Sequence, residues 1–355
     1  MRLAVLAAPA LLAAISLSCA FAQEAPSPTG PPPKSKAPDT TVVDTQGPMQ
    51  TLHIGTNLVN LYFSAHDKSG YITNLRRDDC LVAEDKQPQE IKNFTQEKNL
   101  PLTIGILLDT SGSQQHVLPL EQDSASRFLA EVMRPKDEAF LISFDVNVDL
   151  LADFTNSPRE IKRAIDKASI NTASSSGGVP GIGGGPFPTS NPRGTLLYDA
   201  VFLAANDKLR IEAGRKIIVM LTDGGEQGSQ ETLKTAKEAA QKANAIVYVI
   251  LLADRRFYGG GFGINLADTG AADMERLAHD TGGRVINVGN NGKKLEEAFD
   301  QIQDELRTQY LASYTPTNPK IDGTFRTLNI TCQQGQKVQA RKGYYATPDA
   351  QGSDE

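Results

Sequence analysis

Four stretches of the chain are almost continuously apolar, and polar segments with helical spacing separate them. The apolar stretches are 102–108, 139–144, 216–221 and 245–252. Because neither side of these stretches is polar, each is typical of a strand buried on both faces of a parallel sheet. The segments with helical spacing are 157–168, 195–208, 230–243, 271–280 and 292–306. This alternation predicts an α/β fold with a doubly wound, mostly parallel sheet.

Shorter runs of alternating character flank this region on both sides. They lie at 58–63, 81–83, 90–94, 310–314, 325–331 and 338–345. Short runs bounded by turn-forming residues predict half-buried strands. We therefore expect an N-terminal β segment at 51–98, the α/β domain at 99–306, a C-terminal β segment at 307–346 and a disordered tail at 347–355.

Residues 1–22 have the organisation of an export signal. Arg2 precedes an apolar stretch at 3–17, and the small-x-small pattern at 20–22 fits a cleavage site. A Pro-rich linker at 23–50 follows. We expect cleavage and a secreted or periplasmic mature chain with no membrane insertion. The alternative is a transmembrane anchor, which is disfavoured because the apolar run is short and no charged stop follows it.

Composition narrows the class of protein further. The 355 residues include 36 Lys and Arg against 42 Asp and Glu, so the formal net charge is −6. A mildly acidic chain argues against a nucleic-acid partner. With three Cys and four His, a multi-Cys/His zinc architecture is not expected. Removal of Cys19 with the signal leaves Cys80 and Cys332, which form either one disulfide or two isolated buried thiols.

Oxygen-bearing side chains follow the buried runs. Asp109, Ser111 and Ser113 come at the end of the first run, Asp223 follows a later one, and Thr195 begins a helical segment. Ligands bind at the carboxyl ends of strands in an open parallel sheet. Carboxylates and hydroxyls are hard donors that suit Mg²⁺, Mn²⁺ or Ca²⁺ and not zinc or copper. A cation with so few charged ligands keeps a coordination position that a partner's carboxylate can fill.

The pattern Asp109-x-Ser111-x-Ser113, followed by Thr195 and then Asp223-Gly224, resembles the metal-ion-dependent adhesion site of von Willebrand factor type A (VWA) domains. The resemblance covers about 101–306 and implies a VWA/Rossmann-like sheet. It also implies that Ser111, Ser113 and Thr195 contact the ion through their hydroxyls. Asp109 and Asp223 would then act directly or through water.

The flanking segments resemble those of bacterial secreted proteins called VWFA-related. Because the termini of an A domain lie close together, the two flanks would form one small β module. That arrangement would bring Cys80 and Cys332 into the same sheet. Two departures from the family pattern are Cys80, where a bulky apolar residue is expected, and the Gly-rich insert at 174–194, which could cover the metal face.

We expect an exported, non-enzymatic binding or adhesion protein that captures an acidic group of a protein partner through the cation. The alternative is a structural or assembly component of the cell envelope whose metal site is vestigial or stabilising. An enzyme using the ion as a Lewis acid is disfavoured because no general base is evident near the site. His116 is expected to face solvent, and Asp145 to be a turn or cap residue.

Overall fold

The computed structural model describes residues 58–97, 100–170, 194–252, 266–333 and 336–347, with side chains described from 270 onward in the fourth range. All the described elements belong to one unit, Ile54–Glu355. The predicted export signal and linker, nearly all of the Gly-rich insert and the predicted tail beyond 347 lie outside the described residues.

A six-stranded sheet forms the centre of the α/β region, in the order β11-β10-β9-β6-β7-β8. Its strands are β6 (Leu102–Asp109), β7 (Glu138–Phe144), β8 (Val148–Thr155), β9 (Arg215–Thr222), β10 (Ala245–Leu251) and β11 (Val285–Asn287). Neighbouring strands are parallel, except that β8 runs antiparallel to β7 at one edge. The predicted α/β class with a mostly parallel sheet is confirmed.

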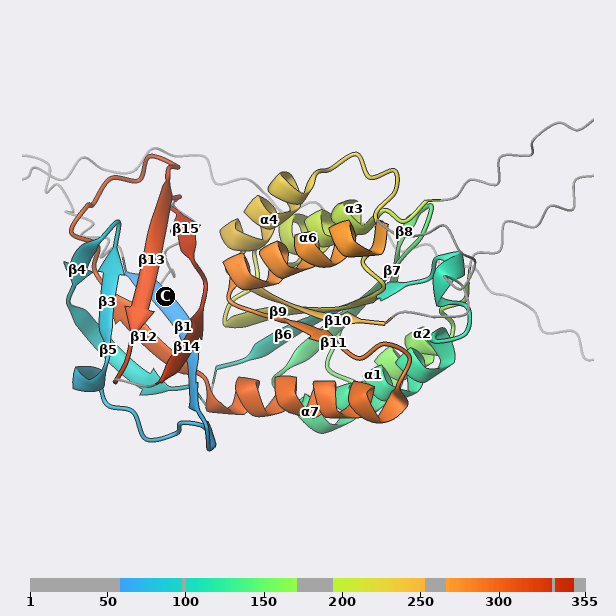
Figure 1. Cartoon of the computed structure of the whole chain (residues 1–355), viewed down its shortest axis with the longest axis horizontal. Coiled ribbons are helices and arrows are strands. Elements are labelled where there is room, and N and C mark those ends of the chain that lie inside the picture. The colour runs from blue at the N-terminus through green and yellow to red at the C-terminus, as the bar shows by residue number, and fades with distance from the viewer. Residues whose placement is uncertain (1–57, 98–99, 171–193, 253–265, 334–335, 348–355) are drawn as a thin grey trace, which may run out of the picture. The chain divides into compact units, whose positions relative to one another are not determined.

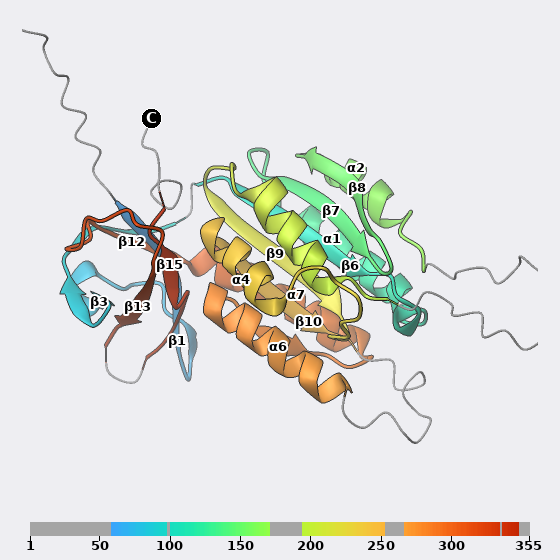
Figure 2. The same cartoon turned by 90° about the horizontal axis from the view of Figure 1, so that it is seen from above.

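Helices cover both faces of this sheet (Figure 1). On one face lie α1 (Leu118–Val132), α2 (Pro158–Ile165) and α7 (Gly292–Thr308). On the other lie α3 (Leu197–Phe202), α4 (Leu233–Lys242) and α6 (Leu266–Thr281), and Figure 2 shows α4 beside α6 over the strands. The segment predicted as one helix at 195–208 is instead α3 continued by a π-helix, Leu203–Leu209.

Two adjacent residues show why the strands read as continuous apolar runs. Ile106 and Leu107 are both fully buried, but they belong to different cores. Ile106 packs with residues of α1 and α7, and Leu107 packs with residues of α3 and α4. Each such side chain stabilises the fold by about 1.5–3 kcal/mol. A polar residue on either face would therefore be costly, and alternation is absent.

Two smaller sheets combine strands from before and after the α/β region. One has the order β14-β1-β12-β5, with β2 paired to β1, and the other has the order β15-β13-β3-β4. Their strands are β1 (Val59–Asp67), β2 (Gly70–Tyr71), β3 (Leu81–Glu84), β4 (Gln87–Gln89), β5 (Ile91–Gln96), β12 (Tyr310–Tyr314), β13 (Phe325–Thr331), β14 (Lys337–Ala340) and β15 (Gly343–Tyr345). Cys80 and Cys332 form a disulfide across a separation of 252 residues.

The segment 338–345, expected as one strand, is two strands in different sheets. β14 pairs with β1, whereas β15 pairs with β13. Gly343 lies against β13 so closely that a Cβ there would be 2.3 Å from the carbonyl oxygen of Arg326. Only glycine fits this close approach. The crossing between sheets therefore occurs just before Gly343, at a point that strand periodicity does not mark.

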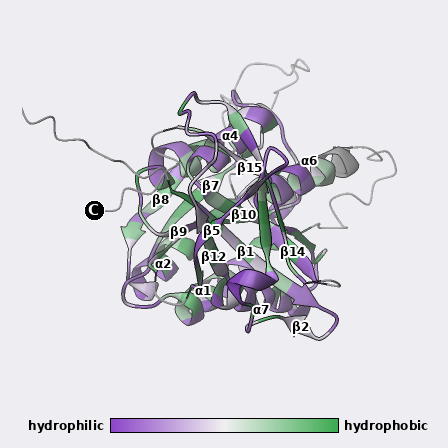
Figure 3. Cartoon of the chain, turned by 90° about the vertical axis from the view of Figure 1, so that its left-hand side faces the viewer, coloured by the Kyte–Doolittle hydropathy of each residue, from purple (hydrophilic) through white to green (hydrophobic). Residues whose placement is uncertain are grey.

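The helices are amphipathic. In α7, Leu295, Ile302 and Leu306 are buried, while most other positions are polar, and Figure 3 colours this helix mainly as hydrophilic. Searched over the described residues, no helix is both long enough and apolar enough to cross a membrane.

Candidate metal site

Four of the five predicted site residues lie at or after the carboxyl ends of two adjacent parallel strands, and the fifth, Thr195, lies just before a helix. Asp109 is the last residue of β6, and Asp223 directly follows β9, the strand paired with β6. Ser111 directly precedes a short 3-10 turn that follows β6, and Ser113 lies within that turn. Thr195 precedes α3. Hydrogen bonds join these loops at three junctions.

The first junction connects the two aspartate loops. Thr222, the last residue of β9, donates a hydrogen bond of 2.6 Å from Oγ1 to Oδ2 of Asp109. The other carboxylate oxygen of Asp109 accepts from the backbone N–H of Ser111 at 3.0 Å. Both oxygens of this carboxylate are thus fixed, one by each loop.

The second junction passes through Asp145, just after β7. Thr110 donates to Oδ2 of Asp145 at 2.9 Å, and the backbone N–H of Leu196 donates to the carbonyl oxygen of Asp145 at 2.8 Å. The backbone N–H of Asn147 donates to Oδ1 of Asp145 at 3.0 Å, so Asp145 has the turn role that the sequence offered beside that of a cap. It connects the Asp109 loop to the Thr195 loop.

The third junction closes the ring of loops. Thr195 and Gln227 exchange two backbone hydrogen bonds, of 2.9 and 3.0 Å. Gln227 lies in the same loop as Asp223, which leads back to Thr222 and Asp109. The Asp109, Asp145, Thr195 and Asp223 loops are consequently connected in a closed circuit of hydrogen bonds.

Glycine is required in the turn that follows Asp223. Gly224 has φ +83°, a left-handed conformation that side chains disfavour. The N–H of Gly225 donates to Oδ1 of Asp223 at 2.9 Å. The Asp223-Gly224 pair quoted in the sequence pattern thus has a conformational basis.

Burial differs along the site. Asp109 is 0% exposed and Ser111 8%, whereas Ser113, Thr195 and Asp223 are partly exposed. The Oγ atoms of Ser111 and Ser113 lie 3.0 Å apart. Asp109 is therefore the buried end of the site, and the hydroxyls and Asp223 are nearer to solvent.

The carboxylate of Asp109 is electrostatically unfavourable as it stands. Burial, followed by repulsion from Asp223, raises the pKa of Asp109 to about 7, although hydrogen bonds from Ser111 and Thr222 act in the opposite direction. A cation placed near both carboxylates would remove this penalty. The charge distribution fits a positive ligand.

The donor set also constrains which ion would fit. Over the described residues, no group of three or more His, Cys, Asp or Glu is arranged to hold a metal. The five candidate residues offer two carboxylates, with hydroxyls for the rest, which fits a hard and partly hydrated ion such as Mg²⁺. Histidine and thiol ligands of the kind that zinc prefers are not part of this set.

Several supporting residues were not predicted from the sequence. Thr110 and Thr222 are polar neighbours of predicted ligands but carry no signal of their own. The carboxylate of Glu226 accepts from the backbone N–H groups of Leu197 and Tyr198, at 3.0 and 3.2 Å, and so fixes the start of α3. His116 is exposed, as expected.

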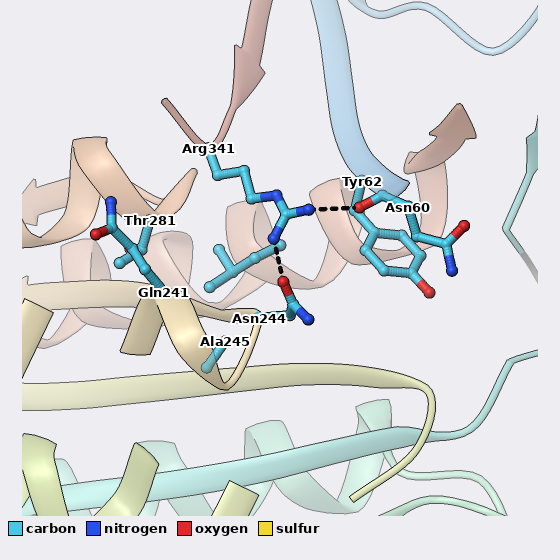
Figure 4. Close-up of a pocket in the computed structure, with 8 residues that line it drawn as sticks. Asn60, Tyr62, Gln241, Asn244, Ala245, Thr281 and Arg341 are labelled. Atoms are coloured by element: carbon cyan, nitrogen blue, oxygen red, sulfur yellow. Dashed lines mark hydrogen bonds between the residues drawn. The ribbon is translucent and has the colours of Figure 1, made fainter. Parts of the chain in front are cut away.

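A small pocket lies away from these loops. It is lined by Asn60, Tyr62, Gln241, Asn244, Ala245, Ile246, Thr281 and Arg341 (Figure 4). Arg341 donates to Oδ1 of Asn244 and, at 2.8 Å, to the carbonyl oxygen of Asn60. The cavity measures about 10 Å³, which is room for about one water molecule and no larger ligand. Because of this small volume, the pocket is not a candidate binding site. The two hydrogen bonds hold the Arg341 side chain in place.

The strand order, the antiparallel edge strand β8 and the position of the aspartate-serine-serine loop after the central strand β6 agree with the resemblance of the sequence to VWA domains. No family model and no curated protein matches the sequence.

Solved structures resemble the chain in fold. The conserved hypothetical protein BatB from Bacteroides thetaiotaomicron is 17% identical, covers 57% of this chain and 98% of its own, and has a TM-score of 0.42. Proximal thread matrix protein 1 from the mussel byssus, with a zinc-occupied MIDAS (metal-ion-dependent adhesion site) motif, is 16% identical, covers 63% of this chain and 50% of its own, and has a TM-score of 0.44.

The vWF domain of the type V pili tip protein Mfa5 from Porphyromonas gingivalis is 14% identical, with coverage of 59% and 95% and a TM-score of 0.40. These similarities concern the fold alone.

Proposed function

We propose that this protein is an exported, non-enzymatic binding protein that captures an acidic group of a protein partner through a divalent cation. Asp109, Ser111, Ser113, Thr195 and Asp223 would hold the ion, with Mg²⁺ as the expected occupant. The observation that carries the proposal is the closed circuit of hydrogen bonds that joins the four loops around two mutually repelling carboxylates.

The chemistry of binding follows from the donors. The hydroxyls are neutral, so a divalent ion that is bound directly by only one of the two carboxylates, with the other acting through water, keeps a net positive charge that attracts a further anion. An Asp or Glu side chain of a partner is such an anion. Ser113, Thr195 and Asp223 are partly exposed, which gives an incoming carboxylate access from solvent.

Export is supported by the disulfide between Cys80 and Cys332. Disulfides persist in oxidising compartments and are rare in the cytosol. The segment predicted as the export signal lies outside the described residues. The secreted or periplasmic location is therefore proposed from the sequence pattern and the disulfide together.

Cation binding is the first experimental test. Purified protein is titrated calorimetrically with Mg²⁺ and Mn²⁺, and Asp223→Asn is compared with Asp300→Asn, a control on the exposed side of α7. We expect Asp223→Asn to lose binding and Asp300→Asn to retain it. Binding that survives both Asp223→Asn and Asp109→Asn would reject the site.

Partner capture is the second test. Immobilised protein is incubated with cell-envelope extract in Mg²⁺, and the retained proteins are eluted with chelator. The proposal expects elution by chelator and no retention on Asp223→Asn. Retention that is insensitive to chelator, together with intact metal binding, would favour the alternative of an envelope component with a stabilising site. Hydrolytic activity that requires the ion would instead indicate an enzyme.

A further inference from the structure

Glu121, in the first turn of α1, is a fully buried carboxylic acid without a visible partner. It is 0% exposed, and over the described residues neither of its carboxylate oxygens has a hydrogen-bond partner. Its helical neighbours at the same spacing, Val117 and Ala125, belong to the apolar core. Burial of an unpaired carboxylate is costly, so its presence at this core-facing position requires an explanation.

The charges that act on Glu121 belong to the candidate metal site. Burial raises the pKa of Glu121 well above its usual value, and repulsion by Asp109 and then Asp223 adds to this effect. Glu121 therefore lies within electrostatic range of both aspartates, although eight or more positions separate it from every predicted ligand in the sequence. The start of α1 offers some compensation, since a helix N-terminus favours negative charge.

A buried amide lies on the same side of this helical stretch. Gln114, directly after Ser113, is 0% exposed, and both of its amide atoms lack partners over the described residues. The backbone N–H of Val117 donates to the carbonyl oxygen of Gln114, and that of Glu121 donates to the carbonyl oxygen of Val117, each at 3.0 Å. Residues joined in this way turn by turn share one side of a helix.

We propose that Glu121 and Gln114 form an inner polar wall of the cation site, in which Glu121 supplies a third negative charge that strengthens cation binding. The wall acts without direct coordination, through the field of Glu121 and through water held by the Gln114 amide. This inference rests on the proposed function, because it assigns a role to residues behind the same site.

The polar wall accounts for both unpartnered buried side chains, that of Glu121 and that of Gln114. Unpartnered buried amides and carboxylates are rare in folded proteins unless water or an ion satisfies them. A nearby divalent cation would compensate the charge of Glu121, and its water shell would offer hydrogen bonds to Gln114. Groups outside the direct ligands of a metal commonly alter metal affinity by about 10- to 100-fold.

The test compares two Glu→Gln variants on the same helix. Full-length mature protein is titrated calorimetrically with Mn²⁺, for the wild type, for Glu121→Gln and for Glu131→Gln. Glu131 is exposed on α1 and serves as the matched control. We expect Glu121→Gln to weaken Mn²⁺ affinity on the order of 10-fold, and Glu131→Gln to leave it unchanged.

A second measurement separates electrostatics from folding. In chelator at pH 8, Glu121→Gln should melt at a temperature equal to or above that of the wild type, because the variant removes a buried charge while keeping the shape. Should Glu121→Gln fail to fold, Gln114→Leu carries the test and should also weaken Mn²⁺ binding. Folded variants at both positions that bind Mn²⁺ like the wild type would overturn the wall but leave the proposed function intact. A wild type that binds no Mn²⁺ would overturn both.

Discussion

Thr222 donates a hydrogen bond of 2.6 Å to the buried Oδ2 of Asp109, across the neighbouring strands β9 and β6. The same Thr222 oxygen accepts from the backbone N–H of Gly224 at 3.0 Å. One hydroxyl thus fixes a predicted ligand and also the turn after Asp223. The geometry of the candidate site depends on this residue even though it is not itself a predicted ligand.

Replacement of Thr222 by Val should destabilise the protein. The variant keeps the side-chain shape but leaves Oδ2 of Asp109 and the N–H of Gly224 without this partner. We expect a loss of about 1–3 kcal/mol in the free energy of unfolding, measured by urea denaturation. Thr331→Val, at an exposed position of β13, is the control. Equal stability of Thr222→Val and wild type would show that this hydrogen bond is not important.

The stability of the metal-free protein should depend on the charge of Asp109. Its pKa is raised to about 7 in the folded state, above about 3.9 in an unfolded chain. Between these values the folded state binds more protons than the unfolded state, so Asp109 contributes a loss of stability as pH rises from about 4 to 7.

Asp109→Asn should remove this contribution. In chelator, its free energy of unfolding relative to that of the wild type should increase between pH 5 and pH 8, and Mg²⁺ should stabilise only the wild type at pH 8. Urea denaturation at both pH values measures the difference. A difference that does not vary with pH would contradict the assigned direction.

The disulfide between Cys80 and Cys332 should stabilise the flanking sheets. It connects segments 252 residues apart, and loss of such a crosslink costs roughly 2–5 kcal/mol. The double variant Cys80→Ala/Cys332→Ala should therefore unfold at lower guanidinium concentration, and a reductant should destabilise the wild type but not the double variant. Thiol titration of unfolded, unreduced mature wild type should find neither sulfhydryl reactive. Two reactive thiols would reject the bridge.

Replacement of the buried Arg341 should destabilise the protein more than replacement of its exposed neighbour Lys342. Burial lowers the pKa of the Arg341 guanidinium, and electrostatic interactions with nearby tyrosines, Tyr314 first, act in the opposite direction. The guanidinium donates hydrogen bonds to Asn244 and Asn60. Arg341→Ala leaves both acceptors unpaired and should cost at least about 2 kcal/mol, whereas Arg341→Met fills the space and should cost less. Lys342→Ala, which is exposed, is the control. In thermal unfolding, a lower melting temperature for Arg341→Met than for Arg341→Ala would contradict this order.

Much of the fold could be predicted because the sheet is buried on both faces. Residues such as Ile106 and Leu107 must both be apolar, and this leaves a clear pattern in the sequence. The positions of Asp109 and Asp223 at strand ends followed from the same pattern. Local periodicity is sufficient where each residue's environment is set by its own strand.

Other features depend on contacts between distant segments, which periodicity does not record. The break between β14 and β15 is set by the approach of Gly343 to Arg326, not by local composition. Glu121 did carry a signal, because it occupies an apolar helical stripe between Val117 and Ala125. The role proposed for Glu121 could not be predicted from the sequence, because it depends on the charges of Asp109 and Asp223, which only the fold brings near it.

The pairing of β5 with β12 has a consequence for how the chain must assemble. The backbone N–H of Glu97 donates to the carbonyl oxygen of Gln309 at 2.8 Å, so the α/β region begins and ends side by side. Apart from the short pairing of β1 with β2, β1 and β5 pair with strands that are made more than two hundred residues later. During synthesis β1 and β5 therefore remain without their later partner strands while the α/β region is made. All six strands of the central sheet belong to the α/β region, so this region can fold before the flanking sheets form.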